Sequence, residues 1–286
     1  MWNNAKIFCV LIFISLLFGC SSVKPIDIKT KLTEPIIIDH TCTDISKIPE
    51  KWIIKAKSEF GITYGHTSHG SQIVSGITSL RYKSRFYDFS NHLNRNKLTL
   101  YDREPSGDLG NPDRRQWAKK TYQLLAEGYG DVNIVIWSWC GQVSNANKED
   151  INDYLNLMNE LETNFPGVAF VYMTGHLDGT GEDGNLNLRN EQIREYCKKN
   201  NKILFDFADI ESFDPDGNYY LDKNANDNCD YLLNETKRNW ADEWCNNNPG
   251  KCTEYRCAHS KSLNCDLKGN AFWWMVARIA GWVPEN

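Results

Sequence analysis

Apolar residues along this chain form short uninterrupted runs that alternate with longer stretches of helical periodicity. Four apolar runs have the length of strands buried on both faces, namely 61–66, 132–139, 168–174 and 203–210. Helical spacing of apolar positions covers 113–127, 148–164 and 188–199, and a last, largely buried helix is predicted over 268–280. Strands that alternate with helices predict a parallel sheet covered on both faces, a three-layer α/β/α sandwich.

The N-terminal residues have a different pattern. Lys6 precedes an apolar stretch over 7–18 that is too short to span a membrane, which predicts an export signal. The signal ends in LFGC, which resembles the lipobox of bacterial lipoproteins and implies removal of 1–19 and a lipid on Cys20. By the same resemblance, Ser21 implies sorting to the outer membrane, on its periplasmic or cell-surface face. A plain membrane anchor is the alternative.

Composition and charge narrow the partners of the remaining chain. Among 286 residues, 32 Lys and Arg stand against 37 Asp and Glu, without a basic cluster that would pair with phosphates. Nucleic acid is therefore not an expected partner. Residues 20–48 contain scattered Pro, Thr, Ser and Lys and predict a tether, whereas 49–286 suits one domain with a sizeable core.

Cysteine usage points to an oxidising compartment. Cys9 lies in the signal and Cys20 is assigned to the lipid, so eight of the ten cysteines remain, and an even number in an exported chain predicts disulfides without fixing their pairing. Four of them crowd 245–265, within a stretch over 211–262 that has little periodicity apart from a short helix over 236–244. We expect this Cys-rich loop insert to act as a lid or substrate-binding segment.

Candidate chemistry begins in the loop GHTSHGSQ, which directly follows the first predicted strand. In open parallel sheets, the loops at the carboxyl ends of the strands form the site. A serine in such a small-residue turn suits a nucleophile, so Ser68 is the first candidate and Ser71 the second. A serine needs a base and oxyanion donors, and His259, just before the last helix, is the candidate base.

These residues, in this order, resemble the SGNH (GDSL-like) hydrolase superfamily from about residue 58 to the C-terminus. The resemblance implies a flavodoxin-like sheet, with Ser68 as nucleophile and His259 as base and then acid. The oxyanion hole would combine the Ser68 backbone amide, Gly107 of PSGDLGNP and Gln142 of WCGQ. Such a site needs no metal or cofactor. Gln142 stands where the family has Asn, and Arg256 stands where the family has the Asp that orients the histidine.

Two carboxylates are candidates, by location, to orient His259 in place of that Asp: Glu254 and Asp209. By resemblance to exported members of the superfamily, we expect a serine ester hydrolase that removes an acyl group, typically acetyl, from a polysaccharide or glycoconjugate. The partners implied are an acylated carbohydrate and, through the lipid anchor, a membrane. Gln142 as a helix cap and Gly107 as a turn residue are the alternatives at those two positions.

Two other functions fit parts of the sequence. His66, His69 and His176 would suit a zinc ion with an open position for water, which would make the protein a metal-dependent hydrolase. A glycan-binding lipoprotein without catalysis is the second alternative, with aromatic residues around 240–244 lining its cleft.

A calcium ion is the one further ligand that the insert suggests. The spaced carboxylates of Asp214, Asp216 and Asp222 resemble a calcium-binding loop, although a solvated polar turn accounts for the same pattern.

Overall fold

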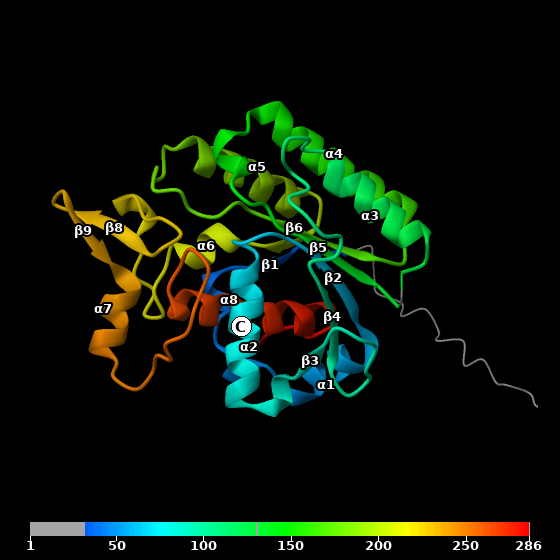
Figure 1. Cartoon of the computed structure of the whole chain (residues 1–286), viewed down its shortest axis with the longest axis horizontal. Helices are drawn as coiled ribbons and strands as arrows, with labels where there is room; N and C mark the ends of the chain where they lie inside the picture. The colour runs from blue at the N-terminus through cyan, green and yellow to red at the C-terminus, as the bar shows by residue number, and fades with distance from the viewer. Residues whose placement is uncertain (1–31, 130, 286) are drawn as a thin grey trace, which may run out of the picture.

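The computed structural model describes residues 32–129 and 131–285, and its centre is a sheet of seven parallel strands (Figure 1). In sheet order the strands are β1 (Ile36–Ile38), β7 (Ile203–Phe205), β6 (Ala169–Met173), β5 (Ile134–Trp137), β2 (Gly61–Gly65), β4 (Leu98–Asp102) and β3 (Phe89–Ser90). The four strands predicted from apolar runs are confirmed as β2, β5, β6 and β7. Their side chains are buried throughout, as expected for strands covered on both faces.

Helices cover the two faces of this sheet and complete the predicted α/β/α sandwich. One face carries α1 (Glu50–Glu59), α2 (Ser71–Lys83) and α8 (Ser262–Ile279), as Figure 1 shows. The other face carries α3 (Gln116–Ala126), α4 (Lys148–Asn164) and α5 (Asn185–Lys199). The helices predicted over 113–127, 148–164 and 188–199 correspond to this second group.

The strand order makes the sheet flavodoxin-like and fixes where a site can form. From the central strand β2 the chain moves to β4 on one side and then returns to β5 on the other side. The connections that leave the carboxyl ends of β2 and β5 therefore diverge, and a crevice opens between them.

The end of β7 and the start of the folded part differ from the prediction. The apolar run over 203–210 is a strand only as far as Phe205, because the Asp206 side chain accepts a hydrogen bond from the Asp209 N–H and starts α6 (Phe207–Glu211). The folded part begins before residue 49, because β1 pairs with β7 in a stretch that the sequence predicted as tether. The predicted signal 1–19, Cys20 and Ser21 lie outside the described residues.

Glycines bring α2 and α8 into unusually close contact. A Cβ added to Gly76 would lie 1.9 Å from the carbonyl oxygen of Cys265, and one added to Gly269 would lie 2.4 Å from the carbonyl carbon of Gly76. The backbones therefore touch where these two glycines meet. This contact brings Gln72 of α2 and Lys268 of α8 within hydrogen-bonding distance of each other. The last helix begins at Ser262, earlier than the predicted 268, so Lys268 lies inside it.

The insert over 211–262 is more ordered than its sequence predicted. It contains a hairpin of β8 (Asp230–Leu233) and β9 (Thr236–Asn239), followed by α7 (Trp240–Asn247). The short helix predicted over 236–244 thus starts only after Asn239, whose side chain accepts a hydrogen bond from the Asp242 N–H. Trp240 is fully buried and packs in the core, so it does not line a cleft as the glycan-binding alternative expected.

Disulfides form within the cysteine cluster of this insert, as expected. Cys245 pairs with Cys252, and Cys257 pairs with Cys265. Four further cysteines of the described ranges are free thiols: Cys42, Cys140, Cys197 and Cys229. Three of these are buried, and Cys140 is partly exposed. In the described ranges, the helices are all too short or too polar to cross a membrane.

Candidate active site

Two loops meet at the crevice between the carboxyl ends of β2 and β5. The first loop, over 66–70, turns directly into α2. The turn is so tight that a Cβ on Gly70 would lie 2.4 Å from the His66 Cβ, so only glycine fits there. The Tyr64 hydroxyl stabilises the turn by donating a 3.0 Å hydrogen bond to the Gly70 carbonyl. The second loop follows Trp137 and carries Cys140.

A thiol, an imidazole and a carboxylate are aligned across this crevice. The Cys140 Sγ lies 3.6 Å from Nδ1 of His69, and Nε2 of the same ring lies 3.0 Å from Oδ2 of Asp227. Asp227 is 158 positions away from His69 in the sequence and belongs to the insert. Its backbone N–H donates to the Leu177 carbonyl at 3.1 Å, which holds this part of the insert against the loop after β6. The three groups have the order nucleophile, base and orienting acid of a catalytic triad.

Each member of this triad changes the protonation of its neighbour. The hydrogen bond with His69 lowers the pKa of the Cys140 thiol against the opposing effect of burial, and the Thr67 hydroxyl lowers it further. Burial alone would lower the pKa of His69, but the hydrogen bonds to Asp227 and Cys140 raise it to about 9. Burial would raise the pKa of Asp227, yet His69 holds it below its ordinary value. The arrangement thus favours a thiolate beside an imidazolium.

Two further histidines enclose the His69 ring. The ring of His176 stacks on one side with a centroid distance of 3.7 Å, and the ring of His259 stacks with a centroid distance of 4.4 Å. The Nδ1 of His176 lies 2.9 Å from the Leu177 carbonyl and donates to it, so its Nε2 is an acceptor. That Nε2 is buried without a hydrogen-bond partner among the described residues. Burial lowers the pKa of His176, which favours the neutral ring.

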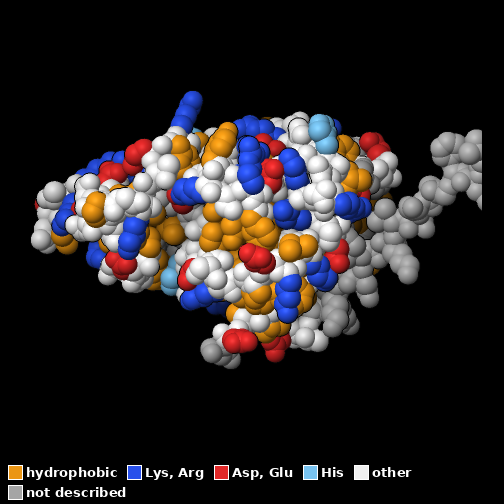
Figure 2. Space-filling view, turned by 90° about the horizontal axis from the view of Figure 1, so that it is seen from below, with side chains coloured by type: hydrophobic (Ala, Val, Ile, Leu, Met, Phe, Trp, Pro, Cys, Tyr) orange, Lys and Arg blue, Asp and Glu red, His pale blue; other side chains and the backbone are white. Residues whose placement is uncertain are grey.

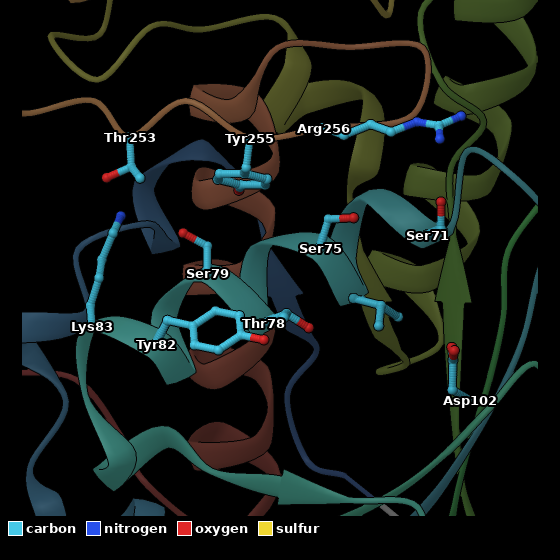
Figure 3. Close-up of a pocket in the computed structure, with 11 residues that line it drawn as sticks. Ser71, Ser75, Thr78, Ser79, Tyr82, Lys83, Asp102, Thr253, Tyr255 and Arg256 are labelled. Atoms are coloured by element: carbon cyan, nitrogen blue, oxygen red, sulfur yellow. The ribbon is translucent and has the colours of Figure 1, made fainter.

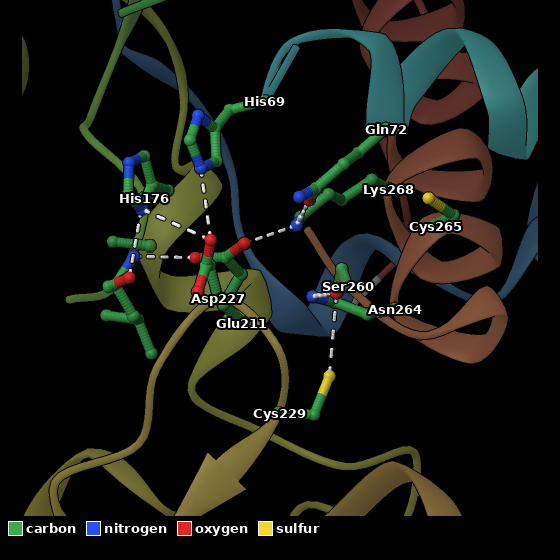
Figure 4. A network of polar contacts seen from close by, with 12 residues as sticks. His69, Gln72, His176, Glu211, Asp227, Cys229, Ser260, Asn264, Cys265 and Lys268 are labelled. Atoms are coloured by element: carbon green, nitrogen blue, oxygen red, sulfur yellow. Dashed lines mark hydrogen bonds and ion pairs between the residues drawn. The ribbon is translucent and has the colours of Figure 1, made fainter. Parts of the chain in front are cut away.

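A buried ionic network connects these loops to α8 (Figure 4). The Nζ of Lys268, fully buried on α8, contacts Oε1 of Glu211 at 2.5 Å and also Oε1 of Gln72. The other carboxylate oxygen of Glu211 accepts the Leu177 N–H at 2.7 Å. The Gln72 side-chain amide donates to the Ala258 carbonyl at 2.8 Å. One ammonium group is thereby connected to the loop of His176 and to the loop of His259.

The predicted pair of Ser68 and His259 is not joined in this structure. His259 is exposed, and its ring faces His69. The Ser68 hydroxyl makes no hydrogen bond to a histidine within the described residues, although the Ser68 carbonyl accepts from the Ser71 hydroxyl at 2.5 Å. Ser71, the second candidate nucleophile, is therefore engaged with its own turn. The sequence thus pointed to the correct loop through Ser68. In the structure, however, the residue of this loop that contacts other candidate groups is the neighbouring His69.

The predicted oxyanion residues lie at the crevice in different roles. The Gln142 Oε1 accepts the Cys140 N–H at 2.7 Å, and its Nε2 donates to Oδ1 of Asp108 at 2.8 Å. Both ends of this amide are therefore used to hold the Cys140 loop against the loop of PSGDLGNP. Gly107 is exposed and has a positive φ of 111°, which suits its alternative as a turn residue.

Neither carboxylate that was a candidate to orient His259 is paired with it. Asp209 accepts from the backbone N–H of His40 and lies 2.6 Å from that ring's Nδ1. Glu254 is exposed and forms no ion pair within the described part of the chain. Arg256, at the position where the SGNH resemblance led us to look for an Asp, is also exposed.

Three predicted zinc ligands are only partly brought together. His66 is buried with its Nε2 2.7 Å from Oδ1 of Asp102 and its Nδ1 2.6 Å from the Thr67 carbonyl, so it belongs to a different set of contacts. His69, Asp227 and His259 are close enough to share an ion. A metal lies in the plane of each imidazole that binds it, whereas the rings of His69 and His259 are stacked at 17°. Stacked rings do not direct their lone pairs to a common point.

The carboxylate of Asp214, first of the three candidate calcium ligands, is saturated by its own loop. It accepts hydrogen bonds from the N–H groups of Asp216 and Asn218 and from the Tyr220 hydroxyl. The Asp216 carboxylate in turn accepts from the Trp244 indole at 3.0 Å. These contacts are those of a polar turn that fixes the insert.

A groove of about 450 Å³ runs along the exposed side of α2, away from the buried face that packs on α8 (Figure 3). One end is formed by Ser71 and Asp102 and lies next to the turn that carries Ser68 and His69. Its opposite wall is the segment over 253–256, which is flanked by Cys252 of one disulfide and Cys257 of the other. Most of the residues that line the groove carry a hydroxyl: Ser71, Ser75, Thr78, Ser79, Tyr82, Thr253 and Tyr255.

Sequence reasoning missed Cys140 and Asp227 as functional residues. Cys140 lies in the WCGQ segment that was singled out for Gln142, but all eight cysteines were considered as disulfide partners. Its place directly after a buried strand and outside the 245–265 cluster could have indicated a free thiol at the site. Asp227 gave no such signal, because it stands among many Asp and Asn residues of the insert.

Comparisons with known proteins add no family to this description. No model of a protein family matches the chain, and no curated protein is significantly similar to it.

Proposed function

We propose that this protein is an acyl hydrolase in which Cys140 is the nucleophile and His69 is the acid and base. The observation that carries the proposal is the alignment of Cys140, His69 and Asp227 at the switch point of the sheet, at 3.6 Å and 3.0 Å. The lowered pKa of Cys140 and the raised pKa of His69 support a thiolate that is present near neutral pH.

The reaction would proceed in two steps. In the first, the Cys140 thiolate attacks the ester carbonyl carbon, and the tetrahedral oxyanion collapses as its C–O bond to the leaving group breaks. His69 gives its Nδ1 proton to the departing alkoxide, so an alcohol and a Cys140 thioester result. In the second step, His69 accepts a proton from water as the water oxygen attacks the thioester carbon. The C–S bond then breaks, which releases the carboxylic acid and regenerates the Cys140 thiolate beside protonated His69. Asp227 keeps the His69 ring oriented and stabilises its protonated form.

Backbone donors for the oxyanion are available at the start of α2. The N–H groups of Ser68, His69 and Gly70 have no acceptor within the described chain, and they precede the first turn of a 13-residue helix. Such N–H groups, together with the helix dipole, stabilise negative charge. Loss of one good oxyanion donor costs about 3 kcal/mol of transition-state stabilisation.

The substrate we propose is an acylated carbohydrate, as expected from the resemblance to exported members of the SGNH superfamily. The groove along α2 supports it, because its surface is mostly apolar with hydroxyl groups along it, which complements the apolar faces and polar edges of sugars. The exported, lipid-anchored location remains part of this proposal. On the face seen in Figure 2, basic and acidic side chains are interspersed, which gives a polyanion no continuous surface to bind there.

A second candidate is a serine esterase of the SGNH type with Ser68 as nucleophile. It is favoured by the position of Ser68 in the turn before α2, one residue from His69 and beside the end of the groove. In that case the loop would rearrange on substrate binding so that a histidine reaches the Ser68 hydroxyl, since catalytic contacts often tighten only in the bound state.

Hydrolysis of a short-chain aryl ester by the purified protein separates these candidates. We expect Cys140→Ala to lower kcat by about 10³-fold or more, because the covalent route is lost, and Ser68→Ala to stay within a few-fold of the parent. The reverse pattern would establish the serine esterase. Activity that disappears with a chelator in the parent protein would instead support a metal-dependent hydrolase. An inactive parent on aryl esters and acetylated glycans would favour the glycan-binding alternative.

A further inference from the structure

The most unusual group outside the triad is the ammonium of Lys268. Its side chain is fully buried, as is the carboxylate of Glu211 with which it pairs at 2.5 Å. The Nζ also lies 3.9 Å from the centroid of the Phe207 ring. A buried ion pair is weak evidence of a stabilising role, since an apolar pair of similar size is often as stable. Its other contacts therefore indicate its purpose.

Both acceptors of Lys268 lead to the loops that carry the outer histidines. Glu211 uses its second oxygen to hold the N–H of Leu177, the residue after His176, at 2.7 Å. Gln72 uses its amide to hold the carbonyl of Ala258, the residue before His259, at 2.8 Å. Gln72 itself lies in the first turn of α2, just after His69.

We infer that Lys268 is a positioning residue for the triad, and this rests on the proposed roles of Cys140 and His69. By fixing the loops of His176 and His259 at once, Lys268 keeps both rings stacked against His69. The enclosed ring then cannot tilt, so its Nδ1 faces the Cys140 thiol and its Nε2 faces Asp227. Loss of this support would uncouple the thiol from the imidazole.

The reactivity of Cys140 toward iodoacetamide, measured against pH, reports this coupling without any substrate. The other free thiols of the described chain are Cys42, Cys197 and Cys229, and burial raises the pKa of each, so alkylation near neutral pH is directed to Cys140. Peptide mass spectrometry assigns the modified residue. In the parent protein, the rate should rise with pH through a midpoint below that of an ordinary thiol.

The informative variant combines Lys268→Met with Glu211→Gln. It removes both buried charges together, so neither is left unpaired, and the new amide at 211 still accepts the Leu177 N–H. We expect the alkylation midpoint to move up by about one unit, which lowers the rate at pH 6 by about tenfold. Gln72→Leu keeps the Lys268–Glu211 ion pair but removes the link to Ala258 and the oxygen that Lys268 contacts on Gln72. It should shift the midpoint in the same direction.

Lys202→Met is the matched control. Lys202 pairs with Glu162, is also largely buried, and lies at the amino end of β7, on the opposite edge of the sheet from the crevice. Its removal should leave the Cys140 midpoint unchanged.

A parent-like midpoint in the folded double variant and in Gln72→Leu would overturn the inference. If the double variant fails to fold, as judged by circular dichroism, Gln72→Leu decides alone. A shifted midpoint in a protein that hydrolyses no ester would support the positioning role of Lys268 while rejecting the proposed function.

Discussion

Cys140 and His69 are the residues whose properties depend most on each other. The imidazole favours the thiolate, the thiolate and Asp227 favour the imidazolium, and burial opposes both charges. The lowered pKa of Cys140 and the raised pKa of His69 both favour the charged pair over the neutral one. The proposed hydrolysis requires both charges, because in it the thiolate attacks and the imidazolium protonates the leaving group.

Hydrolysis should therefore have a bell-shaped dependence on pH. The alkaline limb should lie near pH 9, where His69 loses its proton, and the acid limb below the ordinary range of thiols, where Cys140 gains one. Asp227→Asn removes the charge that contributes most to raising the pKa of His69, so the alkaline limb should move to lower pH. Initial rates from pH 5 to about pH 10 would measure both limbs.

Other groups around His69 and Cys140 also affect the pH at which each limb lies. His69 is faced by His176 and His259 as well as by Asp227, and Cys140 is faced by Thr67 and Asp108. An alkaline limb that stays in place in Asp227→Asn would mean that His69 is not the acid of the reaction.

At the residue scale, the sequence located the crevice but not the chemistry. It singled out the loop of Ser68 and the segment of Gln142, since both follow buried apolar runs, and the structure brings these loops together. It did not predict the pairing of Cys140 with His69, because a side-chain contact between two loops depends on the rotation of each loop. Whether Ser68, His259 or Gly107 takes part in chemistry remains a prediction.

At the element scale, contact between α2 and α8 determines the position of the ionic network. Gly76 and Gly269 let the two backbones touch, and Gln72 and Lys268 then meet at the same interface. The helix propensity of α2 is low, because it contains Gly76 and the three serines Ser71, Ser75 and Ser79. Its packing on α8 supplies the stability that its propensity lacks.

Gly76→Ala should destabilise the protein although alanine is the better helix former. The new Cβ would meet the Cys265 carbonyl oxygen at 1.9 Å, so the helices must separate. We expect the free energy of unfolding to fall by about 3 kcal/mol, as for overpacked cores. Urea denaturation measures it.

Gly167→Ala serves as the control for that substitution. Nothing lies within 4 Å of its added Cβ, and the residue is exposed. Its free energy of unfolding should change by less than about 0.5 kcal/mol. Equal effects of the two substitutions would contradict the proposed close contact of α2 and α8.

At the scale of the whole molecule, alternation of apolar runs and helical stretches was sufficient to predict the α/β/α sandwich. Such a pattern has one favoured solution, a parallel sheet covered on both faces. In the insert, the short helix was predicted too early and the hairpin was not predicted, because this segment has little periodicity. Contacts distant in sequence contribute there, such as the burial of Trp240 and the disulfide from Cys257 to Cys265 of α8. Since Asp227 comes from this insert, the triad is complete only in the folded whole.

The most direct test of the central claim is to find which residue carries the acyl group during turnover. The purified protein would be mixed with an excess of aryl acetate, quenched with acid within milliseconds to seconds, digested and mapped by mass spectrometry. We predict an acetyl group on Cys140 as a thioester, absent in Cys140→Ala and accumulating in Asp227→Asn if deacylation slows. An acetyl group on Ser68 in the parent protein would contradict the assignment of Cys140 as the nucleophile.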